Sequence, residues 1–271
     1  MSMPTHSTVA DVAEVLERLA PLRLAADWDN VGLLLGDRRA NVVRVLTCLT
    51  LTSAVAAEAI ETDVQMVVTH HPLPFRPIDR ITADASSGAI LLSLAAAGIA
   101  VWSSHTAWDS AVGGINDQLA TLLRLTDVEP LEPDTIDASA GFGRCGTPSD
   151  ATTLGDLADS LSRKLHIRGA LITGEKLRSV TRVAIACGSG GEAVVAAEAK
   201  ACDVLVTGEI RLHAALDAMA AGVAVLAVGH HASERFALEQ LAVVLAKAMP
   251  LIETKASDRD TDPFSWHAAF S

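Results

Sequence analysis

The chain has no tyrosine and only five phenylalanines among its 271 residues. Cysteine is also scarce, and no two of the four cysteines have the CxxC spacing of a zinc knuckle. We therefore expect reduced, mostly buried thiols and no disulfide framework. Half of the residues are nevertheless hydrophobic, with many alanines and valines, so the chain can bury a substantial core.

Basic residues are outnumbered as well: 21 lysines and arginines stand against 33 acidic residues, for a net charge of −12. General nucleic-acid binding needs a basic surface that neutralises phosphates, so this function class is not expected. An anionic substrate would need a local positive charge in order to bind, for instance that of a bound metal ion. No apolar run is long enough to span a bilayer, and the first twenty residues lack the pattern of a signal peptide. We expect a cytoplasmic protein that does not bind membranes.

Apolar, β-branched runs alternate with helical segments along the chain, which favours α/β layers with largely parallel strands. Strands are expected near residues 42–49, 64–69, 99–104, 139–145, 181–187, 203–207 and 223–228. Helices are expected near residues 8–19, 53–61, 86–97, 115–124, 153–165, 191–200, 210–220 and 232–247. The acidic stretch TDVEPLEPDTID, with two prolines, marks the expected boundary between domains 1–128 and 129–271.

The sequence also repeats itself in part. AVAAEAIETDVQMVVTHH, residues 54–71, matches AVVAAEAKACDVLVTGE, residues 193–209. Downstream, LAAAGIAVWSSHTAWD, residues 94–109, matches AMAAGVAVLAVGHHASE, residues 218–234. Two matches in the same order favour an ancient duplication, with each half presenting strand ends to a shared cleft; alanine-rich helices that resemble each other by chance remain the alternative.

Histidines and acids follow three of the expected strands, where open α/β sheets usually bind their ligands. The first strand ends in VVTHHPLPF, in which prolines forbid a regular continuation. The other two are followed by HTAWD and HHASE, whose first and last residues share one face of a helix. The candidates, in chain order, are His70, His71, His105, Asp109, His230, His231 and Glu234.

Imidazole and carboxylate groups together suit Zn, Mn, Fe, Co or Ni, and the number of candidates is enough for two ions. A carboxylate such as Glu234 can bridge a pair of ions ~3.5–4 Å apart, as in two-metal hydrolases. The alternative is that these histidines cap buried strand ends through ordinary hydrogen bonds. Glu209 and His213, in VTGEIRLH, and His231 are further candidates for proton shuttles or substrate contacts; a simple helix start explains Glu209 and His213 as well.

Several motifs resemble the Nif-three-like family of dinuclear metal-centre proteins, often labelled GTP cyclohydrolase I type 2 homologues. They are DNVGLLLGD, VVTHHPLPF, SSHTAWDSAVGGINDQLA, VTGEIRLHAALDAMAAGVAVLAVGHHASE and the closing DPF. The resemblance covers nearly the whole chain, in a short form without the domain that longer members insert. It implies two pseudo-duplicated α/β domains around a metal cleft, with the segment from about residue 230 returning to that cleft, and a ring-shaped homohexamer.

The resemblance also assigns roles to residues of this chain. It implies that two divalent ions are held by His70, His71, Asp109, His230 and Glu234, with Glu234 touching both. His105 falls close to the metals, in the second shell or as a weak ligand. One departure is visible, because the family usually has an aspartate where this chain has Thr50.

These observations predict a metal-dependent hydrolase with a dinuclear divalent metal centre, and a GTP cyclohydrolase-like activity is what the resemblance suggests. The substrate is unidentified and would be a small molecule such as a nucleotide. The alternative is a non-catalytic metal-binding or scaffold protein, in which the metal centre serves metal handling or assembly.

Overall fold

The computed structural model describes residues 6–265, so the ends of both predicted domains, residues 1–5 and 266–271, lie outside the described residues. Within this range the chain forms two α/β units. Unit 1 runs to Trp108 and includes Ala237–Thr261, whereas unit 2 contains Asp109–Phe236 and the described residues from Asp262 onward. The predicted boundary at residues 128 and 129 falls inside strand β7 (Leu125–Glu129) of unit 2.

Unit 1 contains a five-stranded sheet in the order β17-β4-β5-β6-β2. Its strands are β2 (Gly32–Leu35), β4 (Arg44–Thr50), β5 (Met66–His71), β6 (Ala100–Ser103) and β17 (Glu253–Ala256). The four strands from β17 to β6 are parallel, and β2 pairs antiparallel with β6 at the edge. Three neighbouring parallel strands, β4, β5 and β6, therefore end at the same edge of the sheet.

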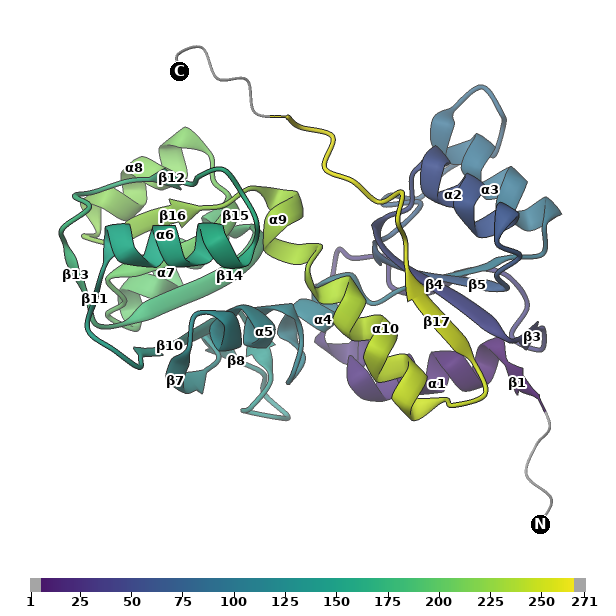
Figure 1. The fold of residues 1–271 in the computed structure, drawn as a ribbon, viewed down its shortest axis with the longest axis horizontal. Coiled ribbons are helices and arrows are strands. Elements are labelled where there is room, and N and C mark those ends of the chain that lie inside the picture. Colours follow the sequence, from purple (N-terminus) through teal and green to yellow (C-terminus); the bar gives the residue numbers. More distant parts are fainter. Residues whose placement is uncertain (1–5, 266–271) are drawn as a thin grey trace. The chain divides into compact units, whose positions relative to one another are not determined.

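Helices cover both faces of this sheet (Figure 1). They are α1 (Val9–Leu19), α2 (Ser53–Glu61), α3 (Ser86–Ala96) and α10 (Ala237–Ala248). One core cluster joins α2 and α3 to the inward side chains of β4, β5 and β6, including the fully buried Val67 and Val101. On the opposite face, the buried Thr47 hydroxyl donates a hydrogen bond to the Leu238 carbonyl at the start of α10. Both faces of the sheet are thus buried, as continuous apolar strands require.

Unit 2 contains a six-stranded sheet in the order β12-β16-β15-β14-β10-β7. Besides β7, its strands are β10 (Arg144–Pro148), β12 (Leu171–Ile172), β14 (Val183–Ser189), β15 (Val204–Glu209) and β16 (Ala224–Ala227). The strands β14, β15 and β16 are parallel, and the outer strands on both sides pair antiparallel. Like unit 1, unit 2 therefore brings three parallel strand ends to one edge.

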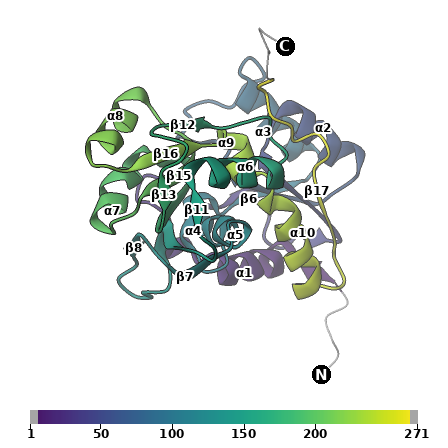
Figure 2. The ribbon, with the colours of Figure 1, turned by 60° about the vertical axis from the view of Figure 1, so that its left-hand side comes forward.

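The two faces of this sheet have separate cores. The helices of unit 2 are α5 (Ile115–Leu122), α6 (Leu154–Lys164), α7 (Ala193–Ala199), α8 (Leu212–Ala220) and α9 (His230–Glu234). One cluster joins α5 and α6 to the sheet, and the other joins α7 and α8 to its opposite face; Figure 2 shows α7 and α8 next to each other. No helix among residues 6–265 is both long and apolar enough to cross a bilayer.

The structure confirms the internal repeat and extends it toward the start of each unit. A strand of two residues, β1 (Ser7–Thr8) or β11 (Thr152–Thr153), leads into α1 or α6. In both helices a threonine N-cap and an aspartate three residues later form a capping box. The strands pair antiparallel with β3 (Asn41–Val42) and β13 (Ser179–Val180). Each unit then continues as strand, helix, strand, helix, strand and a short helix.

Most of the predicted helices and strands match observed elements. The strand expected at 139–145 does not, because residues 141–142 belong to a separate two-stranded sheet and β10 begins only at Arg144. The helix expected at 53–61 is α2, whereas the single helix expected at 232–247 is divided into α9 and α10. The sequence analysis missed β2, β12, β17 and α4 (His105–Ser110), and it missed β7, where it placed a domain boundary. The remaining short elements are β8 (Glu132–Pro133), β9 (Gly141–Phe142) and the 3-10 turns Leu22–Leu24 and Gly190–Glu192.

A buried arginine in unit 2 supports the end of α4. Arg144 is 1% exposed and forms an ion pair with Asp117. Its Nη2 atom also donates to the carbonyls of Ser110 and Ala111, at 3.3 and 3.0 Å, and Nη1 donates to two glycine carbonyls. Burying a charge is tolerated only when it is paired and hydrogen-bonded, and these contacts meet that requirement.

Replacing Arg144 by Met should therefore lower the free energy of unfolding by ~3–5 kcal/mol, because a partly buried carboxylate and several carbonyls lose their buried partner. Arg124→Met is the matched control, since Arg124 forms an exposed pair with Asp150 at 3.4 Å, and it should cost no more than ~1 kcal/mol. Urea unfolding of both variants measures the difference. Equal effects would contradict the structural role of Arg144.

Candidate metal-binding site

Three histidines of unit 1 gather where parallel strands end. His70 and His71 are the last residues of β5, and His105 begins α4 just after β6. One ring nitrogen from each of the three lies within 4.8 Å of the others. The grouping follows from the parallel pairing of β5 and β6, which places residues following each strand at the same edge. Imidazoles at this spacing are able to hold a metal ion.

In two of these rings, the Nδ1 atom lies beside an oxygen atom of a neighbouring side chain. The hydroxyl of Thr50, at the end of β4, is 2.8 Å from Nδ1 of His71. Nδ1 of His105 lies 2.7 Å from a carboxylate oxygen of Asp29, whose side chain is fully buried. Burial opposes ionisation of Asp29, but hydrogen bonds from His105 and Thr106 outweigh it and lower the pKa of Asp29. Asp29 is therefore an ionised acceptor for the His105 ring.

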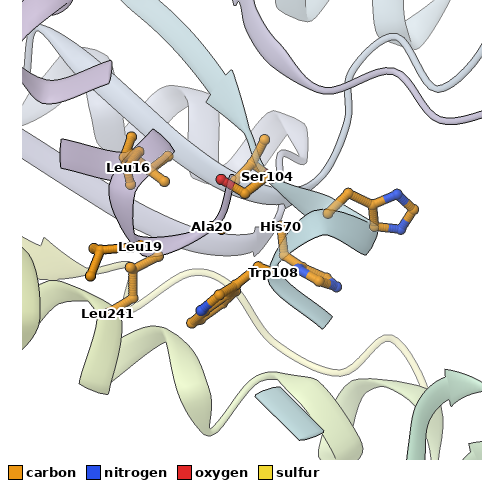
Figure 3. A pocket seen from close by; sticks show the side chains of 10 residues that line it. Leu16, Leu19, Ala20, His70, Ser104, Trp108 and Leu241 are labelled. Carbon is orange, nitrogen blue, oxygen red and sulfur yellow. The ribbon is translucent and has the colours of Figure 1, made fainter. Parts of the chain in front are cut away.

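His70 lies against an apolar wall. Its ring meets Trp108 edge to face, with ring centroids 5.9 Å apart. Both residues line a small pocket together with Leu16, Leu19 and Leu241 (Figure 3). The His70 carbonyl accepts a hydrogen bond of 2.6 Å from the Ser103 hydroxyl on the neighbouring strand. The backbone and the ring of His70 are thus both fixed by unit 1.

Unit 2 presents an imidazole between two carboxylates. His230 and Glu234 lie one turn apart on α9, with Nε2 of His230 3.2 Å from Glu234. The other ring nitrogen is 3.2 Å from Glu209, the last residue of β15. The hydrogen bond to Glu234, followed by that to Glu209, raises the pKa of His230 to about 9 against the opposing effect of burial. Without a metal ion, this histidine is therefore protonated at neutral pH.

Asp109 and Cys187 form a second group in unit 2. The Cys187 thiol lies 3.2 Å from the Asp109 carboxylate, and the Cys187 backbone N–H donates to the side chain of Asn116. Burial and the negative charges of Asp109 and Glu234 raise the pKa of Cys187 well above its usual value. The thiol thus stays protonated and donates to Asp109.

The glycine after Cys187 leaves room for Glu234. Gly188 has φ +63°, and a Cβ atom there would lie 2.4 Å from a carboxylate oxygen of Glu234 and 3.3 Å from Nε2 of His230. The Glu234 carboxylate therefore occupies the space that a side chain at position 188 would need. No local sequence signal marks this contact, because Gly188 and Glu234 lie far apart in the chain.

The other predicted site residues lie in unit 2. His231 is half-buried on α9, and its Nε2 atom is enclosed without a hydrogen-bond partner in residues 6–265. His213 is exposed on α8. The roles predicted for Glu209, His213 and His231 stay predictions. The contact of Asp29 with His105 was missed, although the sequence analysis singled out the motif that contains Asp29.

Comparison with known proteins places the chain among relatives of similar length. The model of the Duf34/NIF3 (NGG1p interacting factor 3) family matches residues 7–263. A Clostridium perfringens protein named GTP cyclohydrolase 1 type 2 homolog is 30% identical over 257 residues, which cover 94% of this chain and 98% of that protein. The Schizosaccharomyces pombe protein NIF3 homolog is 37% identical, with 82% and 83% covered. A solved structure of a Bacillus cereus protein related to NIF3 has a TM-score of 0.90, at 23% identity and with 97% and 100% covered, and shows the same fold.

The raised pKa of His230 predicts how the metal-free protein responds to pH. The stability that its ion pairs contribute is fully present below the ordinary histidine pKa of 6.5 and is lost as the pH rises through about 9. NMR titration of the metal-free protein should therefore find a His230 pKa near 9. Glu234→Gln should lower it more than Glu209→Gln, since Glu234 is the larger cause. A His230 pKa near 6.5 in the unsubstituted protein would contradict this arrangement.

Proposed function

Because the chain belongs to the Duf34/NIF3 family and its strand ends carry grouped imidazoles and carboxylates, we propose that it is a metal-dependent hydrolase with a dinuclear divalent metal centre. The grouping of His70, His71 and His105 within 4.8 Å carries this proposal. Neutral imidazole nitrogens are common ligands of divalent metal ions, and three of them at this spacing can bind one ion together.

The proposed ligands are His70 and His71 from unit 1 and Asp109, His230 and Glu234 from unit 2. The donor types fit divalent first-row ions, which accept nitrogen and carboxylate oxygen together. Glu234 suits a bridging role because it is buried and carries two oxygen atoms beside Gly188. Each proposed ligand sits at the end of a parallel strand or on the short helix that follows such a strand in the chain.

Neighbouring side chains would hold three of the proposed ligands in position through hydrogen bonds. Two divalent ions held by these residues would supply Lewis-acid chemistry and an activated water molecule. Thr50 and Glu209 hold the rings of His71 and His230, and the Cys187 thiol holds Asp109. In this proposal Glu209, His213 and His231 move protons between the site and solvent.

A small anionic molecule such as a nucleotide is the proposed substrate class. The name of the Clostridium relative makes GTP the first compound to test. With a net charge of −12, the protein itself repels anions, so the ions would supply the attraction. We also place the protein in the cytoplasm as a ring-shaped homohexamer, and the exposed apolar side chains of Leu212, Leu216 and Met219 along α8 support self-association.

Metal content per chain tests the proposal. Elemental mass spectrometry of protein reconstituted with Zn, Mn or Fe should find about two ions per chain, as expected for a two-metal site. His70→Ala and Glu234→Ala should each lower that content sharply. Gly188→Ala should do the same by displacing Glu234, whereas Gly98→Ala is the matched control, with a similar φ of +70° and no atom within 4 Å of the added Cβ.

The same preparations should be screened against GTP, generic phosphoesters and cyclic amides. We expect turnover of at least one compound by the metal-loaded protein and its loss in Glu234→Ala, with the fold retained. Silence across all three classes, together with unfolding when the metal is stripped, would contradict the hydrolase and indicate a structural metal centre instead.

A further inference from the structure

We propose that Cys145 and Cys202 form a redox-sensitive thiol pair, which a small hydroperoxide oxidises to an intramolecular disulfide. Both residues belong to the apolar cluster that joins α7 and α8 to the sheet of unit 2. The sequence alone predicts only scattered, reduced thiols, because the two cysteines lie far apart in the chain. The inference is independent of the proposed metal centre, since no step in it requires a bound ion.

The pair lies at the other end of the sheet from the candidate site residues of unit 2. Cys145, on β10, pairs with Ala184, the second residue of β14. Cys202 comes two residues before β15 begins. Because β14 and β15 are parallel, both cysteines are near the amino ends of these strands, whereas Cys187 and Glu209 lie near their carboxyl ends.

The two sulfur atoms contact each other and a guanidinium group. The side chains of Cys145 and Cys202 are joined by a hydrogen bond. Nη2 of Arg182 donates to Sγ of Cys145 at 3.4 Å, and the same nitrogen lies 2.7 Å from Glu129. Because the positive charge of an arginine stabilises a thiolate, this position favours a nucleophilic sulfur.

These contacts make the two thiols unequal. The hydrogen bond from Cys202, and then the charge of Arg182, lower the pKa of Cys145 to about 7 against burial and the negative charge of Glu129. The hydrogen bond to Cys145, together with burial, raises the pKa of Cys202. Near neutral pH, Cys145 is therefore the attacking thiolate and Cys202 keeps its proton. An ionised thiol beside a second thiol is the arrangement found in redox-sensing cysteine pairs.

Charged side chains separate the pair from solvent. Cys145 is fully buried, and Cys202 is 5% exposed. Sγ of Cys145 lies 3.7 Å from an oxygen of Glu129, whose side chain is 47% exposed and also contacts Lys200 at 3.1 Å. The sulfur is thus one side chain away from water. A molecule as small as hydrogen peroxide needs only a movement of this side chain to reach it, so bulky hydroperoxides should react more slowly.

The proposed oxidation balances with the hydroperoxide as the sole oxidant. The Cys145 thiolate attacks one oxygen of the peroxide, the O–O bond breaks, and the products are a sulfenic acid and a hydroxide or alkoxide ion. The Cys202 sulfur then attacks the sulfenic sulfur as the S–O bond breaks, and the Cys202 proton leaves with the hydroxyl group as water. Each sulfur loses one electron, and the peroxide accepts both.

The disulfide would connect two parts of unit 2 that are far apart in the chain. It would join β10 to the connection between α7 and β15, and it would close a loop that contains α6, β14 and α7. Closing such a loop restricts the unfolded chain, so oxidation should stabilise the folded unit.

Peptide mapping of the full-length protein tests this inference. Trypsin places the two cysteines in separate peptides, residues 145–163 and 201–211, and the other two cysteines elsewhere. Hydrogen peroxide added to the folded protein should join these peptides with the loss of two hydrogen atoms, both with and without a chelator. Cys202→Ser should instead leave a sulfenic acid on Cys145 that dimedone traps, and Cys145→Ser should prevent both products.

Alkylation by iodoacetamide tests the role of the arginine. In the unsubstituted protein, the rate at Cys145 should rise with pH through about 7. Arg182→Met should lower the rate at neutral pH by ~3–10-fold, because less of the thiol is ionised, and Arg182→Lys should restore most of it. Arg178→Met is the matched control, since Arg178 is similarly exposed but contacts Asp203 and the Gly222 carbonyl.

The peptide map of the unsubstituted protein decides the question even where a variant fails to fold. A cross-link between Cys145 and Cys202 in the folded protein is the expected result. Oxidation of Cys145 without any cross-link, or a cross-link that forms only in urea, would overturn the proposal. Neither result depends on metal content or turnover, so failure here is distinct from failure of the proposed function.

Discussion

The convergence of parallel strand ends is the constraint on which the candidate site depends. In each unit, three neighbouring parallel strands finish at one edge, so residues that are 20 or more positions apart come together there. Thr50, His70 and His105 follow this rule in unit 1, and Cys187, Glu209 and His230 follow it in unit 2. The helices on both faces bury the strands, and the candidate site residues lie at the edge where the strands end.

The two units use the same scaffold with different side chains. Unit 1 gathers imidazoles and holds them with a hydroxyl and a buried carboxylate, whereas unit 2 gathers carboxylates around one imidazole and a thiol. In unit 2 the hydrogen bonds to Glu234 and Glu209 raise the pKa of His230, and burial together with the charges of Asp109 and Glu234 raises the pKa of Cys187. A cation would relieve the repulsion among these carboxylates, and metal binding should therefore release a proton from His230.

Much of this arrangement was predictable from sequence, because regular elements and strand ends have local signals. Val64–Val68 and the prolines after His71 marked the end of β5. Contacts between distant residues had no such signal: the pairing of Asp29 with His105 joins residues 76 positions apart, and Gly188 makes room for Glu234. The division of the expected helix 232–247 into α9 and α10 was missed, because the sequence has the pattern of a helix over this whole range and no proline or glycine marks the break. Short edge strands such as β2 and β17 are stabilised by their neighbours and not by their own composition.

The most direct test of the central claim is X-ray absorption spectroscopy of the zinc-loaded protein. A dinuclear centre predicts scattering from a second zinc ion at ~3.5–4 Å, together with the pattern of imidazole ligands. Imidazole scattering without a metal–metal distance would mean that the ions bind separately. That result would contradict a shared centre while leaving each unit as a metal site of its own.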